Sequence, residues 1–208
     1  IPVGSTGTQA GGWFNKEINS PDDLQGLKMR IPGVGGSVMS KLGVSTVTLP
    51  GSEVFSALER QVVDAIEWGG PGGNMQEGFD KIAPYMMMPG VHSRAAVHDC
   101  IFNEAAWDKI SDGDKALMEI AGRLTMLDTY LGYAENDLVA FEKLKEESPV
   151  EMVQIDQSLV EAATEASNEW ATEQSAENEW FKRVFEDQSA FLEGLSGLSE
   201  FRFAPGSR

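Results

Sequence analysis

Residues 27–68 read LKMRIPGVGGSVMSKLGVSTVTLPGSEVFSALERQVVDAIEW, and this stretch decides the fold class. Short runs of apolar and β-branched residues alternate in it with runs of helical spacing, and Pro-Gly pairs separate several of them. Such alternation predicts an α/β fold, with the short runs as strands of one sheet. Arg30 and Glu67 each lie at the end of a predicted strand. We therefore expect both at the edge of the sheet where open α/β folds tend to bind ligands.

The rest of the chain predicts two more strands and then long helices. Residues 85–90 and 95–103 are apolar strand candidates, which we expect in the same sheet. Residues 115–147 contain no proline and carry leucines at helical spacing, which predicts one helix of roughly 30 residues or more. A short strand at residues 151–155 and a helical region rich in Trp and Phe complete the pattern.

These elements suggest three parts of the chain. Residues 1–103 are predicted to form a ligand-binding α/β lobe, and residues 104–202 a region of long bracing or dimerisation helices with one short strand. Residues 203–208 are predicted to be a disordered tail. The chain begins with Ile1 rather than Met, and no charged and apolar segment typical of a signal peptide opens it. We therefore expect a fragment of a longer protein whose start is missing.

Composition excludes several classes of function. The chain has 33 acidic and 16 basic residues, a formal charge of −17, which repels nucleic acids and anionic lipid surfaces. No stretch approaches the roughly 20 apolar residues that a membrane-spanning helix needs. The single cysteine, Cys100, cannot form an intramolecular disulfide, and its apolar surroundings in the sequence predict a buried structural thiol.

Four residues suggest a site for a small carboxylate. The guanidinium of Arg30 is a planar fork that matches a carboxylate group. Gln9, Glu67 and the backbone at Trp68 could supply hard oxygen ligands to a cation such as Na⁺ or Ca²⁺. His92 and His98 lack the spacing of a zinc site, although His92 could contact a ligand at the edge of a cleft.

The residues alone leave two other functions open. The first is an enzyme acting on a small carboxylic acid, with Glu67 as general base and Arg30 as substrate anchor, although no His, Ser or Cys motif completes such a site. The second is a structural or dimerisation module, because Leu117, Leu124 and Leu131 recur at seven-residue intervals. That repeat would pack against a missing lobe or a second copy in a homodimer.

Four motifs in order carry a resemblance to a known family. They are TGTQAGGWF at residues 6–14, DDLQGLKMRIPG at 22–33, VTLPGSEVF at 47–55 and VDAIEWGGP at 63–71. The motifs resemble those of the DctP-like periplasmic solute-binding proteins of tripartite ATP-independent periplasmic (TRAP) transporters. Within that family they are similar to the branch that binds 2-oxo and 2-hydroxy monocarboxylates such as lactate. The resemblance runs from residue 6 to about residue 191.

The resemblance implies a fold and a function. The fold would be the second lobe of a periplasmic-binding-protein-like receptor, with a mixed sheet and long C-terminal helices, and most of the first lobe would be missing. Such a receptor is not an enzyme and has no organic cofactor; it closes over a small organic acid in the periplasm and delivers it to TRAP permease subunits in the membrane. A TRAP receptor for a different organic acid is the alternative, since Met86, Met87, Met88 and Val91 replace residues that are often aromatic in this branch.

The resemblance also implies roles for the site residues. Arg30 aligns with the family arginine that holds the ligand carboxylate. Gln9, Glu67 and the backbone at Trp68 align with residues that bind Na⁺ or Ca²⁺, which bridges protein and substrate in the oxo-acid branch. The same four residues, Arg30, Gln9, Trp68 and Glu67, are thus the predicted substrate-binding set.

Overall fold

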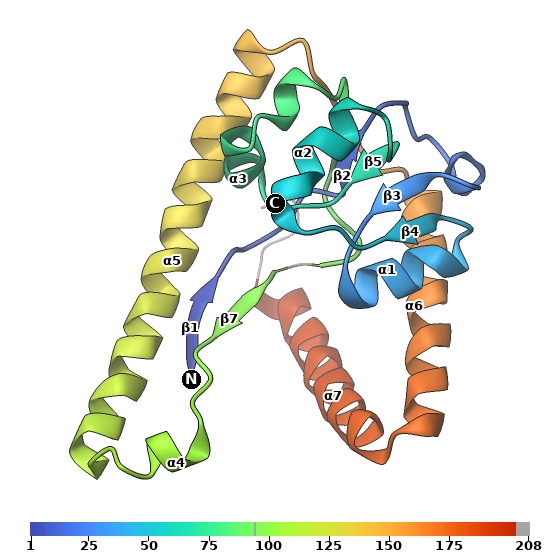
Figure 1. Ribbon diagram of the computed structural model, residues 1–208. Coiled ribbons are helices and arrows are strands. Elements are labelled where there is room, and N and C mark those ends of the chain that lie inside the picture. The colour runs from blue at the N-terminus through green and yellow to red at the C-terminus, as the bar shows by residue number, and fades with distance from the viewer. Residues whose placement is uncertain (94, 203–208) are drawn as a thin grey trace. The chain divides into compact units, whose positions relative to one another are not determined.

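The computed structural model describes residues 1–93 and 95–202, with side chains described as far as residue 198. The chain forms two compact units (Figure 1), of which the first is Ile1–Ala163 and the second begins at Thr164. The predicted tail at residues 203–208 lies outside the described residues. None of the described helices is both long enough and apolar enough to cross a membrane.

A six-stranded mixed sheet is the centre of the first unit, which confirms the predicted α/β class. Its strand order is β4-β3-β5-β2-β6-β8. Strand β3 pairs in parallel with β4 and β5, β2 is antiparallel to β5 and β6, and β8 joins β6 in parallel. The bounds are β2 Gly12–Phe14, β3 Lys28–Arg30, β4 Ser45–Val47, β5 Ala65–Ile66, β6 Tyr85–Met88 and β8 Glu151–Gln154.

Helices connect the parallel strands, as the alternating sequence predicts. Helix α1 (Gly33–Lys41) lies between β3 and β4 in the chain, and α2 (Gly51–Glu59) between β4 and β5. Gly43, just after α1, has a φ of +85°, the left-handed conformation that ends many helices and that glycine adopts without strain. Three short helices complete this part: η1 Pro21–Leu24, α3 Pro71–Gln76 and η2 Phe79–Lys81.

The strand predicted within residues 95–103 does not join the main sheet. Strand β7 (Val97–Asp99) pairs antiparallel with β1 (Pro2–Ser5) in a separate two-stranded ribbon. The prediction of one common sheet is therefore wrong for this strand. Cys100, at the end of the ribbon, is exposed, so the predicted buried thiol is also wrong. The short helix α4 (Glu104–Trp107) follows the ribbon in the chain.

One long helix, α5 (Asp112–Glu147), confirms the prediction of a helix over residues 115–147. Ser111 caps its start, because the Ser111 side chain accepts a hydrogen bond from the Asp114 amide. The helix packs against β1 and α3, and Asp137 accepts a hydrogen bond of 2.8 Å from the Gly72 amide. Burial raises the pKa of the Asp137 carboxyl, and the hydrogen bond from Gly72 opposes that rise.

The packing of α5 changes the division of the chain. Helix α5, strand β8 and the start of α6 belong to the same compact unit as the main sheet, so that unit ends at Ala163 rather than at residue 103. The predicted region 104–202 is not a compact unit by itself. The heptad leucines of α5, namely Leu117, Leu124 and Leu131, are exposed. Whether these leucines pack against a partner stays a prediction.

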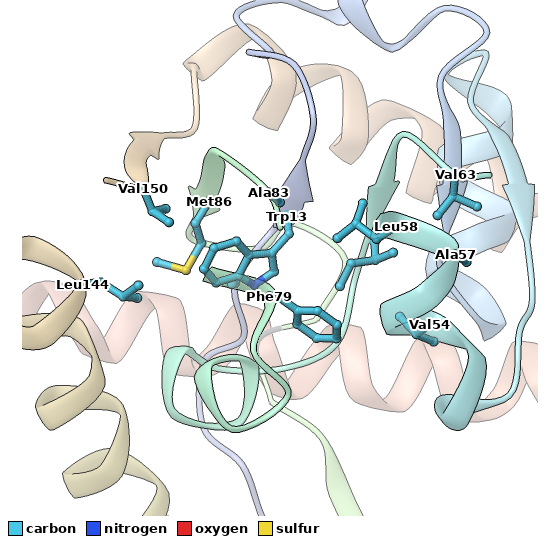
Figure 2. Close-up of a cluster of buried hydrophobic side chains, with 12 residues drawn as sticks. Trp13, Val54, Ala57, Leu58, Val63, Phe79, Ala83, Met86, Leu144 and Val150 are labelled. Atoms are coloured by element: carbon cyan, nitrogen blue, oxygen red, sulfur yellow. The ribbon is translucent and has the colours of Figure 1, made fainter. Parts of the chain in front are cut away.

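Two apolar clusters lie on the two faces of the main sheet. Consecutive strand residues contribute to different clusters: Trp13 and Met86 belong to one, and Phe14 and Met87 to the other. This alternation follows from the strand geometry, in which successive side chains point to opposite faces. Figure 2 shows the first cluster, where Trp13 is fully buried and lies 6.4 Å from the Phe79 ring.

The second unit is helical. Helix α6 (Gln157–Glu177) begins in the first unit and ends in the second, and α7 is Glu179–Arg202. The Trp170 and Phe181 rings meet edge to face at 5.5 Å. The Asn178 side chain accepts hydrogen bonds from the Trp180 and Phe181 amides at the start of α7. The aromatic residues predicted on this region thus include two packed pairs within the unit, Trp170–Phe181 and Phe181–Phe185, whereas Trp180 is exposed.

Gly12 allows β2 to lie close to β5, and its replacement tests that contact. Gly12 has a φ of +138°, and a Cβ atom there would lie 2.6 Å from the Ile66 carbonyl oxygen. We expect Gly12→Ala to lower the free energy of unfolding by about 3 kcal/mol, because both the backbone conformation and the contact become strained. Urea denaturation measures this change.

Gly26→Ala is the matched control. Gly26 also has a positive φ, +69°, but a Cβ there would meet nothing within 4 Å. The expected loss is about 1 kcal/mol, from the backbone conformation alone. Equal losses in the two variants would contradict the close approach of β2 and β5.

Candidate functional site

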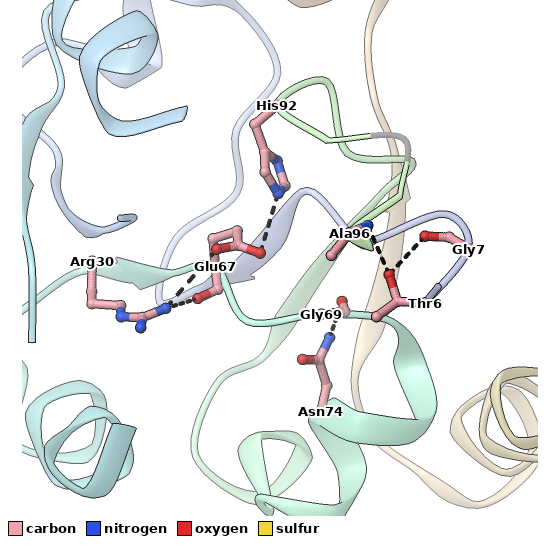
Figure 3. Close-up of polar contacts among 8 residues, drawn as sticks. All are labelled: Thr6, Gly7, Arg30, Glu67, Gly69, Asn74, His92 and Ala96. Carbon is pink, nitrogen blue, oxygen red and sulfur yellow. Dashed lines mark hydrogen bonds and ion pairs between the residues drawn. The ribbon is translucent and has the colours of Figure 1, made fainter. Parts of the chain in front are cut away.

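Arg30 and Glu67 meet at the ends of two neighbouring parallel strands. Arg30 is the last residue of β3 and pairs with Ile66 of β5, so Glu67 is the first residue beyond the paired strand. The Arg30 Nη1 atom donates a hydrogen bond of 2.6 Å to the Glu67 carbonyl oxygen and lies 3.9 Å from Glu67 Oε2 (Figure 3). The sequence prediction that both residues lie at one sheet edge is therefore correct.

The Arg30 side chain is buried but not fully satisfied. Only 11% of it is exposed, and its guanidinium carbon lies 5.2 Å from the centre of the Trp68 ring. Burial lowers the pKa of Arg30 and the Glu67 carboxylate opposes this, but a guanidinium still stays charged. The Nε atom has no hydrogen-bond partner among the described residues. A buried cationic donor without a partner suits an anionic ligand.

Gln9 reaches the same place through backbone hydrogen bonds. The amide of Ala10 donates to the Gly69 carbonyl at 3.0 Å, and the amide of Gly90 donates to the Gln9 carbonyl at 2.9 Å. The Gly69 carbonyl also accepts a hydrogen bond of 2.9 Å from the Asn74 side chain. One carbonyl group therefore connects the segment that carries Gln9 with the segment that carries Glu67 and Trp68.

Asn74 is a structural contributor that sequence reasoning missed. It is fully buried in the short helix α3, and its amide nitrogen holds the Gly69 carbonyl. Its place in a glycine-rich stretch gives no periodic or motif signal that separates it from an exposed turn residue. The bond to Gly69 depends on the fold of residues 69–74, which only the structure shows.

His92 lies deeper than the cleft edge where it was expected. Its side chain is 8% exposed, and Nε2 lies 3.2 Å from Glu67 Oε1. Although it lies this close to the carboxylate, Nε2 has no hydrogen-bond partner among the described residues. His98 also faces the same hollow, but no zinc-like grouping forms around the two histidines within the described part of the chain.

These residues line one cleft, which we call the ligand cleft. Its volume is about 470 Å³, large enough for a small organic acid. The cleft brings together all four predicted site residues, Gln9, Arg30, Glu67 and Trp68, with additional walls from Thr6, His92 and Tyr133. Gln9, Arg30 and Glu67 are among the few buried polar side chains described.

The oxygen atoms at the cleft suit a hard cation. Glu67 offers a carboxylate and Gln9 an amide oxygen, and both side chains are buried at the cleft. The carbonyl of Trp68 accepts no hydrogen bond from the part of the chain that the structure describes. No group of three or more His, Cys, Asp or Glu side chains that could hold a metal occurs there either. Oxygen donors with one carboxylate fit Na⁺ or Ca²⁺ with a ligand completing the shell, and they do not fit zinc.

Comparisons with known proteins agree with this geometry. A family model described as bacterial extracellular solute-binding protein, family 7 (DctP), matches residues 3–178. A monocarboxylate 2-oxoacid-binding periplasmic protein of Nostoc sp. (strain PCC 7120) is 39% identical over 197 residues, which are 92% of this chain and 52% of that protein.

Two solved structures of TRAP periplasmic solute-binding proteins superpose well. One, from Pseudoalteromonas atlantica, contains bound sodium and pyruvate. Its sequence is 33% identical, and the superposition has a TM-score of 0.90 and covers 97% of this chain and 61% of that one. The other, from Bordetella bronchiseptica, is a mixed-occupancy dimer with calcium and picolinate in one site. It is also 33% identical, with a TM-score of 0.92 and coverage of 97% and 60%.

The chain spans about half the length of the curated relative and about three fifths of the solved structures. The family model nevertheless covers most of the chain, the identities exceed 30%, and the fold is shared over nearly all of it. The chain belongs to the DctP family of TRAP transporter solute-binding proteins.

Proposed function

We propose that this chain is part of an extracytoplasmic receptor that binds a small 2-oxo or 2-hydroxy monocarboxylate and presents it to TRAP permease subunits. The observation that carries the proposal is the buried Arg30 guanidinium with an unpaired Nε at the ligand cleft. A carboxylate placed there would receive two charge-assisted hydrogen bonds, and exclusion of water would strengthen them. The family assignment and the periplasmic relative from Nostoc support a periplasmic location for the receptor.

A bound cation would recognise the oxygen on the α-carbon of the substrate. Gln9, Glu67 and the Trp68 carbonyl would hold Na⁺ or Ca²⁺, and the ion would polarise and bind the 2-oxo or 2-hydroxy oxygen of the substrate. The relatives with sodium and pyruvate or with calcium and picolinate support this proposal, because each of those structures combines a cation with a carboxylate that has a second donor nearby.

The other functions considered from the sequence have less support. An enzyme would use Glu67 as a base, but its two carboxylate oxygens lie near the Arg30 guanidinium and the His92 imidazole, and no His, Ser or Cys motif completes a catalytic site. The family consists of solute-binding proteins. Homodimer formation remains a proposal for which one dimeric relative offers support.

Replacing Arg30 tests the carboxylate clamp. We expect Arg30→Lys to weaken pyruvate binding roughly 50-fold or more in the full-length natural protein, because an ammonium cannot form the paired hydrogen bonds. Isothermal titration calorimetry measures the dissociation constant. Arg60→Lys, at an exposed arginine outside the cleft, is the control and should leave affinity unchanged. Equal affinities of wild type and Arg30→Lys would rule out the clamp.

Replacing Glu67 tests the cation site. Glu67→Gln keeps the size of the side chain and removes its negative charge, so the cation concentration that supports half-maximal pyruvate binding should rise about tenfold or more. Pyruvate titrations in choline buffer measure this dependence. The CaCl₂ series is run without chelator, and the NaCl series is run with chelator present to remove calcium.

The matched control is Glu53→Gln, since Glu53 is an exposed residue in the first turn of α2. It should bind pyruvate with the same cation dependence as the wild type. Binding by the wild type that depends on neither cation would refute the proposed cation role of Gln9, Glu67 and Trp68.

A further inference from the structure

His92 occupies a position that the proposed function does not yet explain. Its imidazole is buried beside Glu67, yet it forms no aligned hydrogen bond there. Two glycines make room for it. A Cβ atom on Gly90 would lie 2.9 Å from His92 Cε1, and one on Gly35 would lie 3.3 Å from His92 Cβ. The surrounding backbone therefore fits closely around this side chain.

A second cavity lies on the other side of His92, and we call it the apolar chamber. Its volume is about 30 Å³, which is room for one group of the size of a water or a methyl. Its walls are almost entirely apolar and include Phe14, Met29, Ile31, Met39, Met87 and Leu159. A chamber with such walls favours hydrocarbon over water.

Among the residues that the structure describes, only His92 lines both the ligand cleft and the apolar chamber. The ring is thus a partition between a polar space that contains Arg30 and Glu67 and an apolar space that contains methionines. Methionine side chains are flexible and can rearrange around an added group. Removal of the imidazole would join the two spaces and give the cleft an apolar extension.

We propose that His92 determines chain-length specificity by closing the apolar chamber to the aliphatic part of the ligand. The inference rests on the proposed function, because Arg30 and the cation site would hold the carboxylate and the α-oxygen. The remaining substituent of a 2-oxo acid then decides which apolar wall it meets. With His92 in place the receptor favours a short substituent such as the methyl group of pyruvate.

The test compares a series of 2-oxo acids that differ by one methylene. Pyruvate, 2-oxobutyrate and 2-oxovalerate are titrated into the full-length wild type and His92→Ala at a fixed, saturating cation concentration. In the wild type, affinity should not rise along the series. In His92→Ala, the affinity for 2-oxovalerate relative to pyruvate should increase about tenfold, because the space of the removed imidazole together with the apolar chamber would bury two more methylenes.

Three further variants complete the test. They separate the effect of the volume of the His92 side chain from the effect of its polarity and from the loss of any histidine at the cleft. His98→Ala is the matched control, since His98 lines the ligand cleft but not the apolar chamber, and it should keep the wild-type ratio. His92→Gln has similar volume and should also keep that ratio. His92→Ser is a second opening variant, to be used if the alanine variant does not fold.

The outcomes distinguish the inference from the proposed function. A wild type that binds none of the three acids would overturn both. The wild type could instead bind pyruvate while His92→Ala and His92→Ser change the affinities for all three acids by the same factor. That result would overturn the role of His92 in chain-length specificity and leave the proposed function standing. A wild type that already prefers 2-oxovalerate tenfold would also overturn it.

Discussion

The hydrogen bond from Arg30 to the Glu67 carbonyl is the interaction on which the candidate site depends. It joins the ends of two parallel strands, β3 and β5, at the point where their backbone pairing stops. Burying a guanidinium costs free energy unless its N–H groups have hydrogen-bond acceptors, and the Nε of Arg30 has none among the described residues. The same Nη1 atom also lies 3.9 Å from Glu67 Oε2, so Arg30 contacts both the backbone and the carboxylate of Glu67. Carboxylate recognition and cation binding would therefore be linked through one pair of residues.

The Gly69 carbonyl has a comparable role for the backbone. It accepts hydrogen bonds from the Ala10 amide and the Asn74 side chain, so segments distant in sequence are held around the Trp68 carbonyl. Gly70 allows a further close contact, because a side chain there would collide with the Asp137 carboxylate of α5. The long helix thereby helps to position the glycine-rich loop, which explains why α5 belongs to the same unit as the sheet.

The sequence predicted strands β3 to β8, the long helix and the common location of Arg30 and Glu67, because these follow from periodicity and from the geometry of parallel strands, but it did not predict β1 or β2. It did not predict that β7 would pair with β1, since strand pairing over some ninety residues leaves no local pattern. The roles of Asn74 and His92 were also hidden. A side chain that holds the carbonyl of a loop residue, or that lines two cavities, depends on packing, which a single sequence does not encode in any short motif.

The proposed receptor holds a carboxylate on Arg30 and a cation on Gln9, Glu67 and the Trp68 carbonyl, all in one cleft. The most direct test is a crystal structure of the full-length natural protein with pyruvate and CaCl₂, with anomalous diffraction to locate the calcium. We expect a calcium peak within about 2.6 Å of these three oxygens, and the pyruvate carboxylate on the Arg30 guanidinium. Pyruvate bound away from Arg30, or calcium bound only elsewhere, would contradict it.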